Sequence, residues 1–570
     1  MHRLYKRLIG YLKPYMPLYA ICSLVNGIAL FLLFSSVGIL LREVVKNSAA
    51  IADREKLIQT FLYLLGIICF TALSGFAVFG FRYIEQKIQT KLRRDMVNTY
   101  LHGEEAAVHK FSSTEVLNRI NSDLPRCVEL VGYYMDGRIF APVLSGIFSL
   151  VFLLETNGLL ALATLICSAF NAFAVQIASK KEKEKNAEVL VQKSRLLEFM
   201  QECAAGKTEV RTFSLQEHFQ KKQEEKLKKL AEKKRRIGKY RGARKALLVM
   251  AVDCFTVVSL LLLGNVLARK KWIVFSEVML ALPLADQISQ MITAFGDFRT
   301  VLRTHQGYME RVFEILDLKQ EKTGERKADE TQMKQTLRLE GVSFCYEKKT
   351  VLDDISIEIP FGKKAAFVGP SGCGKSSVLK LILNLYEPQE GELFLGEIPI
   401  RDMVKNQWRN YISYYPQELS FFHTNVAENV GMEGEPDKVR VGEVMKVLDE
   451  ENFFQKAANG YEMILETAGE EFSGGQLQKI ALARCLYRKA PFLLLDEPIS
   501  AMDEENGKLV EKALWKYGKD CTVIVITHRL KLIENFDIIF VMDKGKIVEQ
   551  GKHGELLKLN GRYAGMWKQQ

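Results

Sequence analysis

One uncharged run, residues 17–41 (PLYAICSLVNGIALFLLFSSVGILL), constrains the fold more than any other feature of the sequence. A helix that crosses the ~30 Å hydrocarbon core of a bilayer needs about 20 mostly apolar residues, and this run is long enough. A signal peptide has a shorter apolar core and a small-residue cleavage site, so the run does not match one. The sequence therefore predicts a helix that spans a membrane.

Five more apolar stretches follow and predict a bundle of six membrane-spanning helices. They cover roughly 57–82, 137–155, 158–179, 245–268 and 276–298, and the last is the least apolar. Basic residues crowd the amino end and the segment 222–245, both next to apolar spans. Because positive flanks mark cytoplasmic loops, we expect both termini and the two long connections, 83–136 and 180–244, on the cytoplasmic side.

The two long connections are polar, rich in helix formers and poor in Gly and Pro. We therefore expect them to be helical extensions of the membrane spans. Residues 1–13 form a basic amphipathic stretch, which predicts a helix along the inner membrane surface.

The net charge of +11 raises the question of nucleic acid. The basic residues flank apolar spans, and no partner-reading residues accompany them, so we predict no nucleic-acid partner.

From about residue 337 the sequence changes to that of a soluble α/β domain. The segment 369–376 fits the phosphate-loop spacing GxxxxGK[ST], between an apolar strand at 364–368 and a helix at 376–384. Backbone N–H groups of such a loop hold phosphates, Lys375 reaches the β- and γ-phosphates, and the Ser376 hydroxyl is placed on Mg²⁺. The predicted nucleotide-binding residues here are Gly369, Pro370, Ser371, Gly372, Cys373, Gly374, Lys375, Ser376 and Ser377.

A second anion-binding helix start lies at Phe472-Ser473-Gly474-Gly475-Gln476. Since the domain already has its own phosphate loop, we expect Ser473 to Gln476 to serve a nucleotide held by another subunit. This motif resembles the LSGGQ signature of ATP-binding-cassette (ABC) proteins, with Phe in place of Leu.

Other motifs of the same domain resemble those of ABC proteins. Phe492 to Leu495 form an apolar strand that ends in two carboxylates, Asp496 and Glu497, as in the Walker B motif. The resemblance implies that Asp496 and Gln417 serve Mg²⁺, that Glu497 polarises the attacking water, and that His528 contacts the γ-phosphate. It also implies a D-loop residue, Asp503, and an adenine-stacking aromatic, Tyr346, for which a core aromatic is the alternative.

The resemblance to ABC transporters of the exporter type covers nearly the whole chain. It implies an all-α transmembrane domain of six helices (1–318), a linker (319–336) and an α/β P-loop ABC ATPase domain (337–570). The two long connections would carry coupling helices, at 112–121 and 214–222. ATP and Mg²⁺ are the expected cofactors.

One membrane half and one ATPase domain imply a half-transporter. Its expected partners are the lipid bilayer and a second half-transporter, either the same chain or a different one. The wording FSGGQLQKIALAR resembles Gram-positive peptide exporters. We expect the chain in a cell membrane, that of a bacterium. The approach to the signature, 466–473, is shorter than in many exporters, and this puts one coupling contact in doubt.

Ionisable residues inside membrane spans are functional candidates. Asp286, Gln290, Thr293 and Asp297 recur at spacings of four, three and four, which places them on one helical face, and Asp253 and Asp136 add acid elsewhere. One interpretation is an acid-lined cavity for cationic or amphipathic cargo. The other is that Asp136 and Asp297 lie at the membrane boundary and the rest line a watery gap.

We therefore predict ATP-driven export of a small or amphipathic substrate by a dimeric ABC exporter. Export of a peptide or lipid by a heterodimer is an alternative. Another is an ATP-gated channel or regulatory membrane protein, which the intact Glu497 and His528 argue against. The apolar spans argue against a soluble cassette ATPase that acts on nucleic acid.

Overall fold

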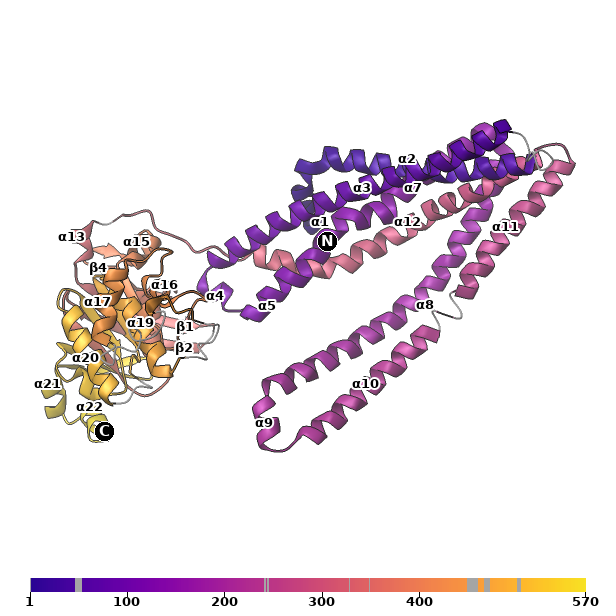
Figure 1. The fold of residues 1–570 in the computed structure, drawn as a ribbon. Coiled ribbons are helices and arrows are strands. Elements are labelled where there is room, and N and C mark those ends of the chain that lie inside the picture. Colours follow the sequence, from indigo (N-terminus) through magenta and orange to yellow (C-terminus); the bar gives the residue numbers. More distant parts are fainter. Residues whose placement is uncertain are drawn as a thin grey trace. The chain divides into compact units, whose positions relative to one another are not determined.

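The structure is a computed structural model that describes residues 2–46, 54–239, 242, 246–327, 329–347, 349–448, 460–465, 472–499 and 504–569. The chain divides into two compact units. The first unit comprises Met1–Leu101 and Phe111–Leu318, and the second comprises His102–Lys110 and Lys319–Gln570. Figure 1 shows the first unit as helical and the second as a mixture of helices and strands.

Long helices dominate the first unit. Its elements are α1 (His2–Leu12), η1 (Lys13–Tyr15), α2 (Met16–Lys46), α3 (Arg54–Leu101), α5 (Ser113–Asn118), η2 (Arg119–Asp123), α6 (Leu124–Glu129), η3 (Leu130–Tyr134), η4 (Asp136–Phe140), α7 (Ala141–Thr156), α8 (Gly158–Ala205), α9 (Lys207–Thr212), α10 (Gln216–Lys239), α11 (Ala246–Arg269) and α12 (Phe275–Leu316).

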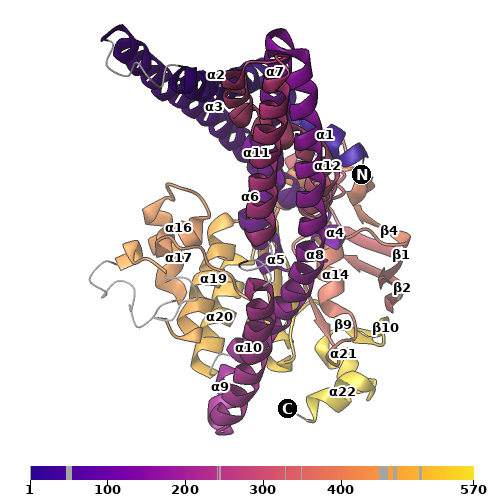
Figure 2. The same cartoon turned by 90° about the vertical axis from the view of Figure 1, so that its right-hand side faces the viewer.

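The longest helices exceed what a bilayer requires. Helices α3 and α8 have 48 residues each, which corresponds to about 72 Å against a hydrocarbon core of ~30 Å. Helices α8 and α10 run side by side, as Figure 2 also shows, with the Phe199 and Phe219 rings stacked at 5.9 Å. The prediction of helical extensions of the spans is confirmed.

Four helical stretches among the described residues are long and apolar enough to cross a membrane. They are Arg3–Lys46, Phe61–Leu101, Ser113–Thr156 and Phe275–Phe295. The shorter apolar helices Gly158–Phe173 and Cys254–Arg269 coincide with the predicted fourth and fifth spans.

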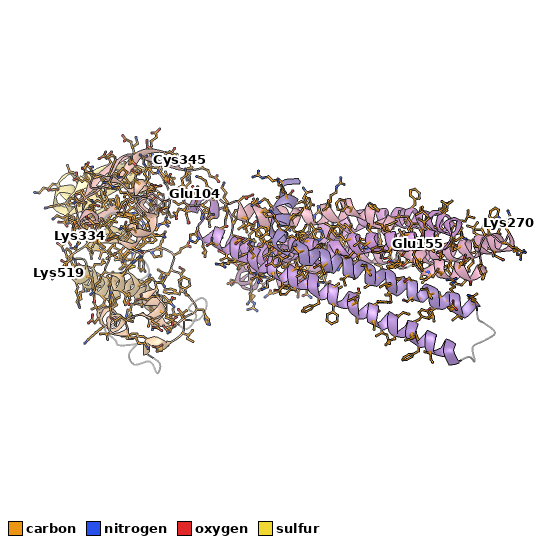
Figure 3. All side chains as sticks on the ribbon, turned by 90° about the horizontal axis from the view of Figure 1, so that it is seen from above. Glu104, Glu155, Lys270, Lys334, Cys345 and Lys519 are labelled. Atoms are coloured by element: carbon orange, nitrogen blue, oxygen red, sulfur yellow. The ribbon has the colours of Figure 1, made fainter. Side chains whose placement is uncertain are left out.

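Two tight turns of the first unit lie together. Asn157 begins α8 and its Oδ1 accepts hydrogen bonds from the backbone of Leu159 and Leu160. Its Nδ2 donates to the carbonyl of Trp272, in the turn between α11 and α12 (3.3 Å). Figure 3 shows Glu155 and Lys270 toward the same end of this unit. The turn between α7 and α8 and the turn between α11 and α12 therefore share one end of the bundle.

The amphipathic helix α1 packs on protein. Leu8 and Leu12 are buried in one apolar cluster with residues of α3 and α12. The Tyr5 hydroxyl donates to the carbonyl of Leu302 (2.7 Å). The apolar face of α1 thus contacts α3 and α12.

The helical run between α5 and α7 is irregular. It passes through the π-helical turns η2, η3 and η4, and Gly132 has a non-helical backbone (φ −82°, ψ −128°). A Cβ at Gly132 would lie 2.9 Å from a Glu85 carboxylate oxygen. Such π-turns are a recognised cause of kinks.

Asp136 lies just beyond this kink and is fully buried. Its carboxylate accepts hydrogen bonds from the Ser23 hydroxyl and from Asn26 Nδ2 (2.7 Å). The Asn26 Oδ1 in turn accepts from the Ser74 hydroxyl (2.7 Å). Neither sequence interpretation of Asp136 anticipates this network, which connects η4 to α2 and α3.

Short helices interrupt the two long connections earlier than predicted. They are α4 (Glu105–Val108), which belongs to the second unit, and α9. Ser112 is instead the N-cap of α5, with its hydroxyl accepting from the Glu115 backbone (3.2 Å), so 112–121 begins a helical run. Most of 214–222 belongs to α10. The two segments expected to be coupling helices are therefore parts of longer helical runs and not separate short helices.

The second unit is built on two sheets. Its elements are α4, α13 (Glu330–Met333), β1 (Leu337–Tyr346), β2 (Lys349–Ile359), β3 (Lys364–Val368), α14 (Lys375–Ile382), β4 (Glu390–Leu395), β5 (Ile398–Pro399), η6 (Ile400–Asp402), α15 (Lys405–Asn410), β6 (Ile412–Tyr415), α16 (Val426–Gly431), α17 (Lys438–Leu448), η7 (Gly460–Glu462), α19 (Gly474–Arg488), β7 (Phe492–Asp496), α20 (Glu504–Tyr517), β8 (Thr522–Ile526), η8 (Leu530–Ile533), β9 (Ile538–Asp543), β10 (Lys546–Gly551), α21 (His553–Lys558) and α22 (Arg562–Trp567).

The larger sheet has the strand order β10-β9-β3-β8-β7-β6, and its neighbours pair in parallel except for β10 with β9. The smaller sheet, β2-β1-β4-β5, is antiparallel. Along β3, Ala366 and Val368 face one apolar cluster while Ala365 and Phe367 face the other. This burial on both faces is typical of a parallel strand and explains its continuous apolar sequence.

The segment predicted as a linker, 319–336, packs within the second unit. Met333 is fully buried. The Gly324 N–H donates to the carbonyl of Met403 (3.1 Å), and a Cβ on Gly324 would meet the Asp402 carbonyl at 2.1 Å. The described residues of this segment therefore belong to the α/β unit.

We predict that Ser23→Ala lowers the free energy of unfolding by about 1–3 kcal/mol, because it removes a donor from the buried Asp136 carboxylate. Ser149→Ala is the matched control, since the Ser149 hydroxyl is buried and has no hydrogen-bond partner among the described residues. Thermal unfolding in detergent would compare the two variants. Equal losses of stability in both would contradict a stabilising role of the network.

Candidate functional site

The predicted nucleotide residues follow four neighbouring parallel strands. The phosphate loop follows β3, Asp496 ends β7, His528 follows β8 and Gln417 follows β6. The strands are in register, with Phe367 opposite Ile526 and Leu495 opposite both Val525 and Tyr415. Their carboxyl ends therefore meet at one edge of the sheet, where α/β proteins bind ligands.

The phosphate loop requires glycine at two points. Gly369 has φ +148°, and a Cβ there would lie 2.2 Å from the carbonyl oxygen of Met542. Gly374 has φ +110°, and a Cβ there would lie 2.7 Å from Leu352. Both backbone conformations are ones that only glycine adopts without strain. The loop thus holds its backbone close to β9 and β2 before α14 begins.

Lys375 is the first residue of α14 and is 5% exposed. Its ammonium donates to the carbonyl oxygens of Gly369 and Pro370, both at 2.9 Å. Burial raises the pKa of the neighbouring Cys373 thiol, with the Lys375 charge opposing it. The fixed positive charge therefore lies inside the loop, and Cys373 acts as a small apolar residue.

A second feature of this edge is a buried carboxylate with one oxygen that accepts no hydrogen bond from the described residues. Asp496 is 2% exposed and its Oδ1 has no hydrogen-bond partner among the described residues. Burial raises the pKa of Asp496, and a hydrogen bond from Ser376 opposes this. A hydroxyl and a carboxylate are ligands that Mg²⁺ takes together with nucleotide phosphates. Ser376 and Asp496 thus fit the predicted metal, while Gln417 is exposed.

Glu497 occupies an unusual backbone conformation next to this carboxylate. Its φ is +54°, a region that non-glycine residues seldom adopt. The Glu497 N–H donates to the carbonyl of Ile526 (2.9 Å), which extends the pairing of β7 with β8. Its Oε1 lies 3.0 Å from Nε2 of His528. Strain of this kind is concentrated at functional sites, and here it accompanies a carboxylate–imidazole pair.

Tyr346 ends β1 within an aromatic cluster. Its ring meets Phe344 edge-on at 4.8 Å and Tyr386 at 5.3 Å, and Lys380 Nζ lies 5.8 Å from its centre. Phe344 is buried (2% exposed), whereas Tyr346 is partly exposed. Of these two aromatics, Tyr346 therefore has the more available ring face.

The signature residues form an open helix start. The Ser473 hydroxyl accepts from the Gln476 backbone (3.3 Å), and Gln476 Oε1 accepts from the Ser473 backbone (2.8 Å). A Cβ on Gly474 or Gly475 would meet nothing within 4 Å. No hydrogen bond joins these four residues to 369–376 in the described part of the chain. Asp503 and the approach 466–471 lie outside the described residues.

The membrane residues predicted for a substrate cavity are only partly brought together. Gln290 Nε2 donates to the exposed Asp286 carboxylate (2.7 Å), one turn apart on α12. The intervening Gln287 is buried and accepts a hydrogen bond from Ser145 of α7 (2.6 Å). Asp253 lies in α11, but its side chain and that of Asp297 are outside the described residues.

The fold and this edge define a membrane protein with a P-loop ATPase domain. Two family models match the chain, "ABC transporter transmembrane region" over residues 16–290 and "ABC transporter" over residues 352–500. The chain belongs to the ABC transporters of the exporter type, as a half-transporter with one membrane region and one ATPase domain. It hydrolyses ATP in a reaction coupled to transport.

Relatives and a solved structure agree with this assignment. The ATP-dependent lipid A-core flippase of Chromohalobacter salexigens is 28% identical and covers 99% of this chain and 97% of its own length. That of Francisella novicida is 28% identical, with coverage of 89% and 87%. A bacterial Atm1-family ABC exporter with ATP bound has the same fold, with a TM-score of 0.77, 18% identity and 98% coverage of both chains.

We predict that Glu497→Gln lowers kcat for ATP by about 10²–10⁴-fold, because the amide cannot accept a proton from the attacking water. Equilibrium binding of ATP should stay unchanged, since the phosphate loop and Lys375 are untouched. Steady-state hydrolysis and ATP binding would be measured on the same detergent-purified sample. A kcat within a few-fold of wild type would show that Glu497 is not the base.

Proposed function

We propose that this chain exports an amphipathic, lipid-like substrate across a bacterial plasma membrane as one half of a dimer. The observation that carries the substrate class is the exposed polar pair Asp286 and Gln290 on α12. Farther along the same helix Phe295 and Phe298 are also exposed (68% and 43%). A charged group exposed to hydrocarbon is costly, so this face fits a water-filled or substrate-filled space. The relatives named as lipid flippases support the same class.

The roles proposed at the ATP site follow its geometry. The backbone of the phosphate loop and Lys375 bind the phosphates. Ser376 and Asp496 would hold Mg²⁺, with Gln417 beside them, and the metal would neutralise charge on the phosphates. Glu497 accepts a proton from the attacking water, and His528 holds that carboxylate in place through the 3.0 Å contact. Tyr346 offers its exposed ring face to adenine.

A second chain completes the site in this proposal. The open N-terminus of α19, with Ser473 to Gln476 at its start, carries the partial positive charge that attracts phosphate. We infer that this start faces the ATP of the partner and that Asp503 lies at the same interface. ATP then closes the two ATPase domains, and hydrolysis lets them reopen. Both termini are proposed to be cytoplasmic, as the basic flanks of the spans indicate.

Mixing two inactive variants tests the shared site. Lys375→Ala breaks the phosphate loop and Ser473→Arg blocks the signature, so each variant alone should be nearly inactive. A mixed dimer of two such copies would contain one site with both defects and one intact site. We expect doubly tagged, purified mixed dimers to recover up to about half of the wild-type ATPase activity, well above either variant alone.

No recovery in a verified mixed dimer would mean that each site lies within one chain. Failure of the chain to pair with itself would identify a heterodimer, and the same test would then use the partner chain. The purified wild-type chain provides the reference for both oligomeric state and activity.

Fluorescent amphiphiles of matched chain length and opposite headgroup charge test the substrate class. In proteoliposomes we expect ATP-dependent export to favour the cationic amphiphile, and Asp286→Asn to reduce this preference several-fold, as removal of one charge contact does. Asp253→Asn is measured in parallel, and Thr90→Ala, an exposed change on α3, is the control. Unchanged export and stimulated ATPase activity in both Asp variants would exclude the acidic cavity.

A further inference from the structure

The second unit contains a piece of the chain that continues directly from a long membrane helix. Helix α3 ends at Leu101, and the next residues, His102–Lys110, belong to the second unit. Figure 3 labels Glu104 in this piece. It pairs with the segment that follows α12. The Glu321 N–H donates to the carbonyl of His102 (2.9 Å) and the Glu104 N–H to that of Lys319 (2.8 Å), around an antiparallel bridge between Gly103 and Gln320.

Glu321 connects this bridge to the body of the ATPase unit. Its carboxylate accepts two hydrogen bonds from the Arg409 guanidinium, one of them 2.9 Å from Nη1 to Oε2. Lys405 Nζ lies 3.4 Å from the same carboxylate. Burial alone would raise the pKa of Glu321, but the bonds from Arg409 and Lys405 outweigh it and hold the pKa below its usual value. The pair is thus a charged, two-pronged contact, the most directional kind that side chains form.

Arg409 also reaches the carboxyl end of the phosphate-loop helix. Its Nε donates to the carbonyl of Leu383 (3.2 Å) and its Nη2 to that of Asn384 (2.9 Å). The neighbouring, fully buried Trp408 donates to the carbonyl of Ile382 (2.8 Å). Helix ends leave such carbonyls without intrahelical donors, and a cation there is favoured by the helix dipole.

The helix between these contacts is short. Helix α14 has eight residues, begins with Lys375 in the phosphate loop and ends at Ile382. Its eight residues span about 12 Å, a little over two turns of hydrogen-bonded backbone. Because these turns are bonded to one another, a displacement of Lys375 would reach the carbonyls that Arg409 holds.

We propose that Glu321 and Arg409 form a positioning link between the phosphate-loop helix and the chain that continues into α3. The link runs from α14 through the Arg409 guanidinium to the Glu321 carboxylate, and from the Glu321 backbone to His102, next to the end of α3. Neither residue belongs to the nucleotide-binding set. Their role is to make the membrane helices respond to the nucleotide, and it rests on ATP-coupled transport, not on the identity of the substrate.

The same contacts would be present if Glu321 and Arg409 only stabilised the fold of the ATPase unit. The test must therefore distinguish transmission of the nucleotide signal from a contribution to stability. Hydrogen–deuterium exchange of the purified full chain, compared without nucleotide and after trapping with ATP and vanadate, reports on 54–101 and 275–316 and on the phosphate loop separately. The variants are Glu321→Gln, Arg409→Lys and the double change. Arg409→Lys keeps the charge but loses the planar, two-pronged geometry.

We expect the nucleotide-dependent exchange difference in 54–101 and 275–316 to fall about fivefold in each single variant, at the lower end of usual coupling energies. The difference at the phosphate loop and the KM for ATP should stay within about twofold of wild type. The double variant should lose no more than the worse single variant, because both changes break one link.

Glu462→Gln is the matched control, since Glu462 pairs with Lys438 in the same unit (2.5 Å) but on exposed surface. It should behave as wild type. A wild-type response of the membrane helices in both single variants would overturn the proposal. An equal loss of the responses at the phosphate loop and in the membrane helices, which a purely stabilising role predicts, would also overturn it. Additive losses in the double variant would do the same. No transport substrate is present, so failure of the proposed cargo would not affect this result.

Discussion

Parallel pairing of β3, β8, β7 and β6 is the constraint on which the rest of the ATPase unit depends. Lys375, Asp496 and His528 are far apart in the sequence and meet only because their strands end at one edge. A shift of one residue in any pair would turn its side chains to the opposite face. The Glu497 N–H bond to Ile526 adds one more rung to β7 and β8 and holds the left-handed backbone of Glu497. The register of the sheet and the position of the proposed base are therefore set by the same bonds.

The two units each contain a buried aspartate, and the two carboxylates differ in whether their oxygens have hydrogen-bond partners. Asp136 has both carboxylate oxygens occupied, by Ser23 and Asn26, whereas Asp496 keeps an oxygen without a partner in the described residues. Buried polar atoms are nearly always satisfied, and an unsatisfied one calls for an explanation. At Asp136 the explanation of burial is a closed hydrogen-bond network that stabilises the packing of helices. At Asp496 the open oxygen lies beside Ser376 and is available to a cation.

Much of this arrangement could be predicted from the sequence, because the informative features are local. The structures of the glycine-containing loop 369–376 and of the apolar run 17–41 are explained by residues that lie close together in the sequence. The network of Asp136 could not be predicted, since periodicity reports which residues share a face but not what covers it. The position of the first short helix was recoverable in part. Ser112 followed by Glu115 is a helix-start pattern, and the structure has that cap at the start of α5, whereas the separate short helix before it is α4.

The two ends of α14 have different proposed roles, one in binding the nucleotide and the other in contacting Arg409. Lys375 at its start is proposed to bind the nucleotide, and the closing contact on that nucleotide is proposed to come from Ser473 of a second chain. The carbonyls at its end are held by Arg409 and, through Glu321, by the residues that follow α3, all within one chain. Because the carbonyls accept from a rigid guanidinium and not from a flexible ammonium, little motion is lost between the helix and Glu321. In the proposed arrangement, the half-transporter depends on its partner for closure on ATP and carries the resulting displacement through its own bonds.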